Sequence, residues 1–264
     1  RSQEMNMKKA SILACPLELF ATGCQDLDIS NPNNPNRESV LQSSSDLQSL
    51  VSTSFRTWFN QTEGGYPGIA LNYVADEFSP CFFDWGGLDL VRPDPRVAVN
   101  PLTGGGVNLT ADPWQGYFRI LAGVNTALRT ISQNNVVIKE SGVDVTGRAK
   151  TFAKFTQGLS HGQIALIYDK GYISTENLDF DALGTDQVKA QLRPYKEVMD
   201  TALAELNASL TLAKANPFTL SGGGSEWIPG VSMTNVQLQR LIHTYMARFM
   251  AYNARTPAER PRFR

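Results

Sequence analysis

The stretch that decides the fold is residues 112–131, which read DPWQGYFRILAGVNTALRTI. Asp112 and Pro113 are a favourable N-cap and first helical residue. Apolar side chains then recur every three or four positions, which is the period of an amphipathic helix. They are Trp114, Tyr117, Phe118, Leu121, Val124, Leu128 and Ile131. We therefore predict a long helix from Asp112 with one buried face.

Five further segments carry the same helical period: residues 45–60, 70–78, 147–170, 194–210 and 234–249. Ser45 with Gln48, and Thr234 with Gln237, have the spacing of capping boxes. Gly158 and Gly162 leave part of one face of the fourth predicted helix without side chains, so a neighbouring helix can approach closely. Long helices separated by turns predict an all-α fold, a TPR-like (tetratricopeptide-like) α-solenoid of antiparallel helix pairs. Long irregular loops at 79–111 and 217–233 interrupt it, and loops of this length are usually functional.

The N-terminus has the parts of a lipoprotein leader. Lysines at 8 and 9 precede a largely apolar run, and Ala21-Thr22-Gly23 precedes Cys24. We expect residues 1–24 to be this leader, with Cys24 as the acylated residue; the alternative is an ordinary N-terminal helix. Residues 25–44 are rich in Asn and Pro and read as an extended tether. The helical domain is then 45–264, and no apolar run is long enough to span a membrane.

Composition argues against several classes of protein. The 24 basic and 25 acidic residues give a net charge of -1, and no basic stripe indicates nucleic-acid binding. The cysteines, Cys15, Cys24 and Cys81, have neither metal-site nor disulfide-framework spacing. His161 and His243 each stand alone on a predicted helix and are interpreted as packed or surface residues. No catalytic motif is present, so we predict no enzyme, no cofactor and no metal.

Aromatic residues in the two long loops are candidate sugar contacts. Trp85 follows Phe83 and Asp84 in the first loop, and Trp227 lies in the second. Flat rings can stack on the C–H faces of sugars, and a carboxylate can accept from their hydroxyls. For Trp85 and Trp227 the alternative is that each buried ring pins its loop to the body.

Several positions match short glycosylation signals. Asn60, Asn108 and Asn207 begin Asn-x-Ser/Thr triplets. Thr201, within Asp200-Thr201-Ala202, resembles the short O-glycosylation site used by Bacteroidota. These four residues are predicted modification sites.

Blocks spread along the chain, taken in order, resemble the SusD/RagB family. They are Cys24 with Leu27-Asp28-Ile29 and Asn31-Pro32-Asn33; Asp46-Leu47 to Phe55-Arg56-Thr57-Trp58 with Ala75-Asp76; Trp114-Gln115-Gly116-Tyr117-Phe118-Arg119-Ile120 with Asn125 and Leu128; Arg148 with Phe155, Gly158, Ala165-Leu166 and Tyr168-Asp169-Lys170-Gly171-Tyr172; and Pro194-Tyr195, Ala202-Leu203 and Ala247-Arg248 to Asn253-Ala254-Arg255-Thr256. Members of the family are considerably longer, so the resemblance covers their N-terminal, helical half.

This resemblance implies a non-catalytic, lipid-anchored protein on the outer face of the outer membrane. It implies a SusC-like TonB-dependent transporter as partner and an oligosaccharide or other nutrient as ligand, bound by an aromatic-rich surface. Cys24 would be the anchor and Trp85 a sugar-contacting ring. A different function also fits the residues: a structural subunit of an extracellular filament, in which an ordered N-terminal segment docks on the next copy.

Overall fold

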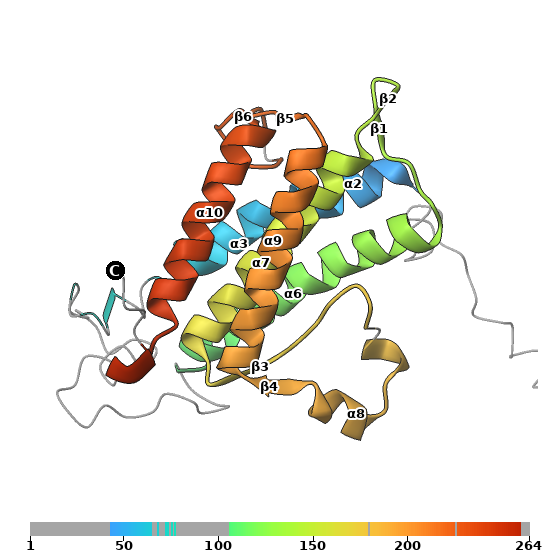
Figure 1. The fold of residues 1–264 in the computed structure, drawn as a ribbon. Helices are drawn as coiled ribbons and strands as arrows, with labels where there is room; N and C mark the ends of the chain where they lie inside the picture. The colour runs from blue at the N-terminus through green and yellow to red at the C-terminus, as the bar shows by residue number, and fades with distance from the viewer. Residues whose placement is uncertain are drawn as a thin grey trace, which may run out of the picture. The chain divides into compact units, whose positions relative to one another are not determined.

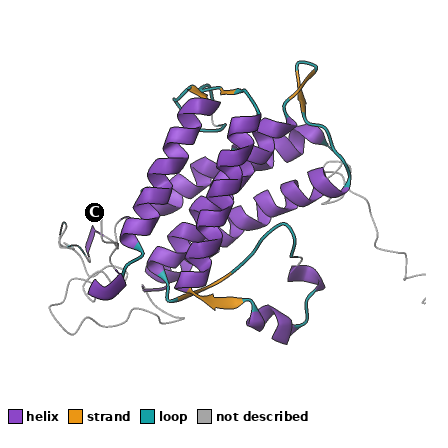
Figure 2. Ribbon diagram, viewed as in Figure 1, coloured by secondary structure: helices purple, strands orange, loops and turns teal. Residues whose placement is uncertain are grey.

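The computed structural model describes residues 43–64, positions 68, 72, 73, 75 and 77, and residues 106–259 except 179 and 225. Residues 1–40 and 41–264 separate into two units, and every described residue belongs to the second. Helices make up most of it (Figure 2). The predicted fold class, mostly helical with little β-structure, is confirmed for this part of the chain.

The helices and turns have the following bounds. The helices are α2 (Ser44–Ser52), α3 (Ser54–Thr62), α6 (Gly106–Gln133), α7 (Thr146–Ile167), the short α8 (Thr185–Ala190), α9 (Tyr195–Ala215) and α10 (Asn235–Tyr252). Single 3-10 turns lie at Phe180–Ala182 and Pro257–Glu259. Figure 1 shows α7 between the other long helices.

Three small antiparallel hairpins join the helices. They are β1 (Lys139–Glu140) with β2 (Val143–Asp144), β3 (Lys170–Tyr172) with β4 (Leu192–Pro194), and β5 (Thr219–Leu220) with β6 (Met233–Thr234). The β3–β4 hairpin closes a long excursion, residues 173–191, that carries α8. We call these residues the arm; α8 has no buried residue of its own.

Helix α7 runs antiparallel to α6 and α9. The Ser209 hydroxyl of α9 donates to the Thr151 carbonyl (2.7 Å), while further along α7 Gly158 lies against Ala202 and Leu206. Residue numbers therefore rise along α7 in the direction in which they fall along α9. The same opposed register joins α6 to α7 through Asn125–Gln157 and Trp114–Tyr168, and α9 to α10 through Ala213–Asn235.

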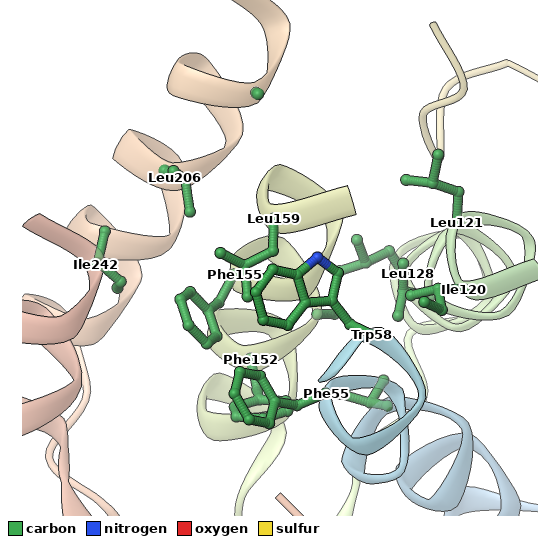
Figure 3. Close-up of a cluster of buried hydrophobic side chains, with 14 of the residues drawn as sticks. Phe55, Trp58, Ile120, Leu121, Leu128, Phe152, Phe155, Leu159, Leu206 and Ile242 are labelled. Atoms are coloured by element: carbon green, nitrogen blue, oxygen red, sulfur yellow. The ribbon is translucent and has the colours of Figure 1, made fainter. Parts of the chain in front are cut away.

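The core forms around the aromatic residues of α7. Phe155 stacks on Phe55 with ring centroids 6.1 Å apart, and Trp58 meets the Tyr245 ring edge-on at 5.5 Å. Burying one such ring contributes about 1.5–3 kcal/mol. Figure 3 shows Phe152, Phe155 and Leu159 of α7 in the centre, surrounded by Phe55 and Trp58 of α3, Ile120, Leu121 and Leu128 of α6, Leu206 of α9 and Ile242 of α10.

The predicted first helix, 45–60, is in fact two helices. The N-cap is Ser43, not Ser45: its hydroxyl accepts from the Asp46 amide (3.3 Å). The helix breaks at Thr53, whose hydroxyl donates to the Ser49 carbonyl (2.7 Å). Hydroxyl side chains compete in this way with helical backbone bonds. The run Ser52-Thr53-Ser54 therefore favours an interruption that the apolar period does not reveal.

The predicted start of the helix at Asp112 is also wrong, because α6 already begins at Gly106. Pro113 lies inside this helix and is buried. Proline has no backbone N–H, so it favours the first turn of a helix, and this preference led to the predicted start. Packing of the buried proline ring outweighs the preference here. The capping box at Thr234 and Gln237 is confirmed, with Thr234 Oγ1 accepting from the Gln237 amide (3.3 Å). The predicted helix at 70–78 lies mostly outside the described residues.

The glycine face of α7, where Gly162 lies, gives the first testable prediction. A Cβ at Gly162 would fall on the buried ring of Phe249, whereas a Cβ at Gly123 in α6 would meet nothing within 4 Å. We expect Gly162→Ala to lower the free energy of unfolding by about 1–3 kcal/mol through overpacking. Gly123→Ala should raise it by up to about 1 kcal/mol through helix propensity. Urea unfolding of both variants tests this, and an equal change in both would show that close approach at Gly162 is unimportant.

Candidate functional site

Most of the residues predicted to contact ligand or membrane lie outside the described part of the chain. These are Cys24, Phe83, Asp84 and Trp85. Trp227 is described, and its side chain is fully buried. The predicted sugar contact at Trp227 is therefore wrong, and the alternative, a loop pin, is correct.

The burial of Trp227 has a clear physical basis. Its indole meets the Phe152 ring edge-on at 5.1 Å, and the Arg148 guanidinium lies 4.7 Å from the indole centroid. Its backbone amide donates to the Ser52 carbonyl (2.6 Å), which caps the C-terminal end of α2. The loop between β5 and β6 is thus fixed to α2 and α7 by one residue.

The predicted glycosylation positions differ in exposure. Asn60 and Asn207 are exposed on α3 and α9. Thr201 is half-buried within α9, and its hydroxyl donates to the Glu197 carbonyl (2.9 Å). Asn108 lies in the first turns of α6.

A second group of aromatic residues, which we call the peripheral aromatic cluster, lies where α6 meets the β3–β4 hairpin. Unlike the core rings, its members are all half-buried. Trp114 contacts Phe118 at 4.7 Å and Tyr168 at 5.0 Å between ring centroids. Tyr172 meets Phe118 at 5.9 Å and Phe180 at 6.1 Å. Five rings from three segments thus form one continuous, partly exposed surface.

The cluster has two layers. Trp114, Phe118 and Tyr168 pack against the hydrophobic core. Tyr172 rests on the Trp114 and Phe118 rings, and Phe180 rests on Tyr172. Burial raises the pKa of the Tyr168 phenol, so its hydroxyl stays neutral at physiological pH. The cluster is thus a mainly aromatic surface with an inner and an outer layer.

Strand β3 orients the outer layer. Side chains alternate along a strand, so Lys170 and Tyr172 share one face and Gly171 takes the other. At Gly171 a Cβ would meet Ile164 at 2.6 Å and Val198 at 3.4 Å. The hairpin can therefore lie directly on α7 and α9 only with glycine there, and this brings Tyr172 to the rings of α6.

Buried polar side chains of α6 and α7 hold the beginning of the arm; we call them the clamp. Asn125 Nδ2 donates to the Ser174 carbonyl (2.8 Å), and Arg129 Nε donates to the Glu176 carbonyl (2.9 Å). Gln157 Nε2 donates to Asn125 Oδ1 (2.6 Å). Because the main contacts are to backbone atoms, the clamp fixes the path of the chain between Tyr172 and Phe180.

An ion pair and a histidine complete the clamp. Lys154 Nζ lies 2.7 Å from Glu176 Oε1. The Ser174 amide donates to His161 Nε2 (3.1 Å), so His161 carries its proton on Nδ1. Nδ1 then donates to Glu205 Oε2 of α9 (2.7 Å). The prediction of His161 as a packed residue is confirmed, and His243 is exposed.

The His161–Glu205 pair is placed for structure rather than catalysis. Both ring nitrogens of His161 are engaged, and both side chains are buried. A general base needs a free nitrogen within reach of a substrate proton. The described residues contain no group of three or more His, Cys, Asp or Glu arranged to hold a metal. Within them, no helix is both long and apolar enough to cross a membrane.

A separate groove of about 750 Å³ lies between α9 and α10. Its lining is mostly aliphatic and thioether, with a single ring, Tyr252. The Arg248 guanidinium lies 5.7 Å from that ring centroid. This groove therefore offers far less aromatic surface than the peripheral aromatic cluster.

Comparisons with known proteins return no relative. No family model, no curated protein and no solved structure matches the chain.

Neither the cluster nor the clamp is predicted by the sequence. Trp114 and Phe118 belong to an apolar helical stripe, and the helical period does not distinguish the edge of that stripe from its centre. The signal for the clamp was the unusual polar content of the fourth predicted helix, where Lys154, Gln157 and His161 fall at helical spacing. Three polar residues on one side of a buried helix require partners.

The clamp gives a prediction about the arm. Asn125→Ala removes the amide that links Ser174 and Gln157 and leaves buried polar groups unpaired, which costs about 1–3 kcal/mol. In the Asn125→Ala variant, we expect amide hydrogen exchange to accelerate, relative to wild type, more in residues 173–178 than in α9. The exposed Asn207→Ala should change stability by less than about 0.5 kcal/mol. Uniform acceleration of exchange over all helices would contradict a local role.

The two glutamates of this network predict opposite pH effects. Burial raises the pKa of Glu205 despite the His161 partner. Its contribution to stability is complete below the unfolded carboxyl pKa of about 4.3 and is lost as the pH rises through the folded pKa. Burial also acts to raise the pKa of Glu176, but hydrogen bonds from Gln157 and Lys154 outweigh it, so that pKa is lowered. Its contribution is present above about 4.3 and lost in acid.

We therefore expect Glu205→Gln to be increasingly stabilising, relative to wild type, as the pH rises from about 4 to 8. Glu176→Gln should become increasingly destabilising as the pH rises through the acid range to about 5, and its effect should then stay constant. Urea midpoints of the three proteins at several pH values measure both differences. Parallel curves for the two variants would contradict the assignment.

Proposed function

We propose that this chain is a non-catalytic capture protein that binds glycans through the peripheral aromatic cluster. The observation that carries the proposal is the convergence of two blocks that resemble the SusD/RagB family. Trp114 and Phe118 come from one block, Tyr168 and Tyr172 from the other, and the fold brings their rings into contact. A TPR-like helical body supports a rigid platform in this proposal.

The chemistry of the cluster suits a sugar. Ligand sites combine apolar and aromatic walls with a few polar groups that orient the ligand. Here half-buried rings provide the apolar area, and the exposed Gln115 and Arg119 lie beside them on α6. The clamp fixes the outer rings in advance, so less conformational entropy is lost on binding.

The proposal extends to the cell surface. A lipid anchor at Cys24 would hold the protein at the outer face of the outer membrane, and a SusC-like TonB-dependent transporter would take up the captured ligand. These parts are supported by the leader-like sequence and the family resemblance.

Tyr172 provides the sharpest test, because its ring lies outside the hydrophobic core. Loss of one aromatic contact costs about 1–2 kcal/mol, so we expect Tyr172→Ala to weaken oligosaccharide binding roughly tenfold or more. Tyr252→Ala, which removes a ring that is 65% exposed on α10, is the matched control and should leave binding unchanged.

The measurement is binding of immobilised starch, xylan, mannan and pectin oligosaccharides, followed by calorimetry on those retained, with thermal unfolding of each variant. Equal affinity for Tyr172→Ala and Tyr252→Ala would exclude the cluster as the contact surface. Failure of the wild-type protein to retain any of these oligosaccharides would refute the proposed function.

A further inference from the structure

Two cations that have no ion-pair partner among the described residues lie beside the peripheral aromatic cluster. Arg119 and Lys170 are exposed, and neither forms an ion pair with another described residue. The neighbouring cations are paired: Arg255 with Asp169, and Lys196 with Glu259. The described residues therefore leave positive charge beside the cluster uncompensated at two positions.

Both cations are attached next to one pair of rings. Lys170 shares the face of β3 that carries Tyr172, and Arg119 follows Phe118 on α6. The Phe118 and Tyr172 rings are 5.9 Å apart. Each positive residue is thus attached to the chain close to one of these two rings.

One described acidic residue lies further along α6. Asp112 is seven residues before Arg119, which is about 10 Å along a helix axis. Along α6, the acidic residue thus precedes Trp114 and the cationic residue follows Phe118.

We propose that the ligand captured at this surface is an acidic glycan. A sugar ring would pack on Phe118 and Tyr172, and its carboxylate or sulfate ester would lie between Lys170 and Arg119. Hydrogen bonds between ionised partners are about twice as strong as neutral ones, and Arg binds planar anions through two N–H groups. This inference rests on the proposed function and specifies its ligand.

The test compares three oligosaccharide probes by calorimetry: oligogalacturonate, its carboxyl-reduced neutral form, and a chondroitin sulfate oligosaccharide. We expect an acidic probe to bind at least about tenfold more tightly than the neutral one, with affinity that falls steeply as salt is added. The double variant Lys170→Ala/Arg119→Ala should lose this preference and retain the weaker, neutral binding.

Lys214→Ala/Arg240→Ala is the matched control. Both residues are exposed, and they lie near the β5–β6 hairpin, at the opposite end of α9 and α10 from the cluster. This variant removes the same charge and should bind as wild type does. Tighter binding of oligogalacturonate identifies the carboxylate as the recognised group, and tighter binding of the sulfated probe identifies the sulfate ester.

Two results would overturn the inference, and they are distinguishable. If the neutral probe binds as tightly as the acidic ones, or both double variants lose affinity equally, the acidic-ligand inference is wrong while glycan capture stands. If no probe binds the wild-type protein, and no oligosaccharide is retained in the wider panel, the proposed function fails as well.

Discussion

The structure depends on one constraint: α7 is buried on all sides although much of it is polar. Threonine and serine side chains on this helix bond to its own carbonyls, as Thr151 does with Gly147 (2.7 Å) and Ser160 with Thr156 (2.8 Å). Lys154, Gln157 and His161 are too long for this and need partners from other segments. Burial without partners would cost several kcal/mol in total. The surrounding elements must therefore supply hydrogen-bonding groups as well as apolar surface.

The arm supplies those groups, and this links the core to the candidate site. Its backbone at Ser174 and its carboxylate at Glu176 satisfy α7, while α8 adds no buried residue. In return, the path of the chain past Ser174 sets where Tyr172 and Phe180 can lie. The buried network thus determines the position of exposed rings, and Gly171 allows the hairpin to approach closely enough for this to occur.

Local signals in the sequence predicted the helices and some of their details. The helical period located α7, α9 and α10, and the spacing of Thr234 and Gln237 identified the N-cap of α10. The break at Thr53 and the true start of α6 were missed, because hydroxyl competition and tertiary packing outweigh the period there. The clamp joins His161 to Glu205, 44 positions away. No local pattern specifies such a pairing, because it depends on which helices become neighbours.

The helix at 106–133 shows why the binding surface was harder to predict than the fold. Adjacent positions on an α-helix are turned by about 100°, so one apolar stripe includes residues at its centre and at its edges. Tyr117 is fully buried, with its hydroxyl 3.1 Å from that of Thr62, whereas Trp114 and Phe118 are half-buried on the side of the hairpin. The helical period of apolar residues predicts that all three side chains belong to the core. Which edge remains open depends on how far the neighbouring element extends, and here the hairpin covers the edge with rings rather than aliphatic side chains. Residues at the edge of a stripe therefore combine two roles, packing against the core and presenting a surface, and only the position of the neighbouring element separates them.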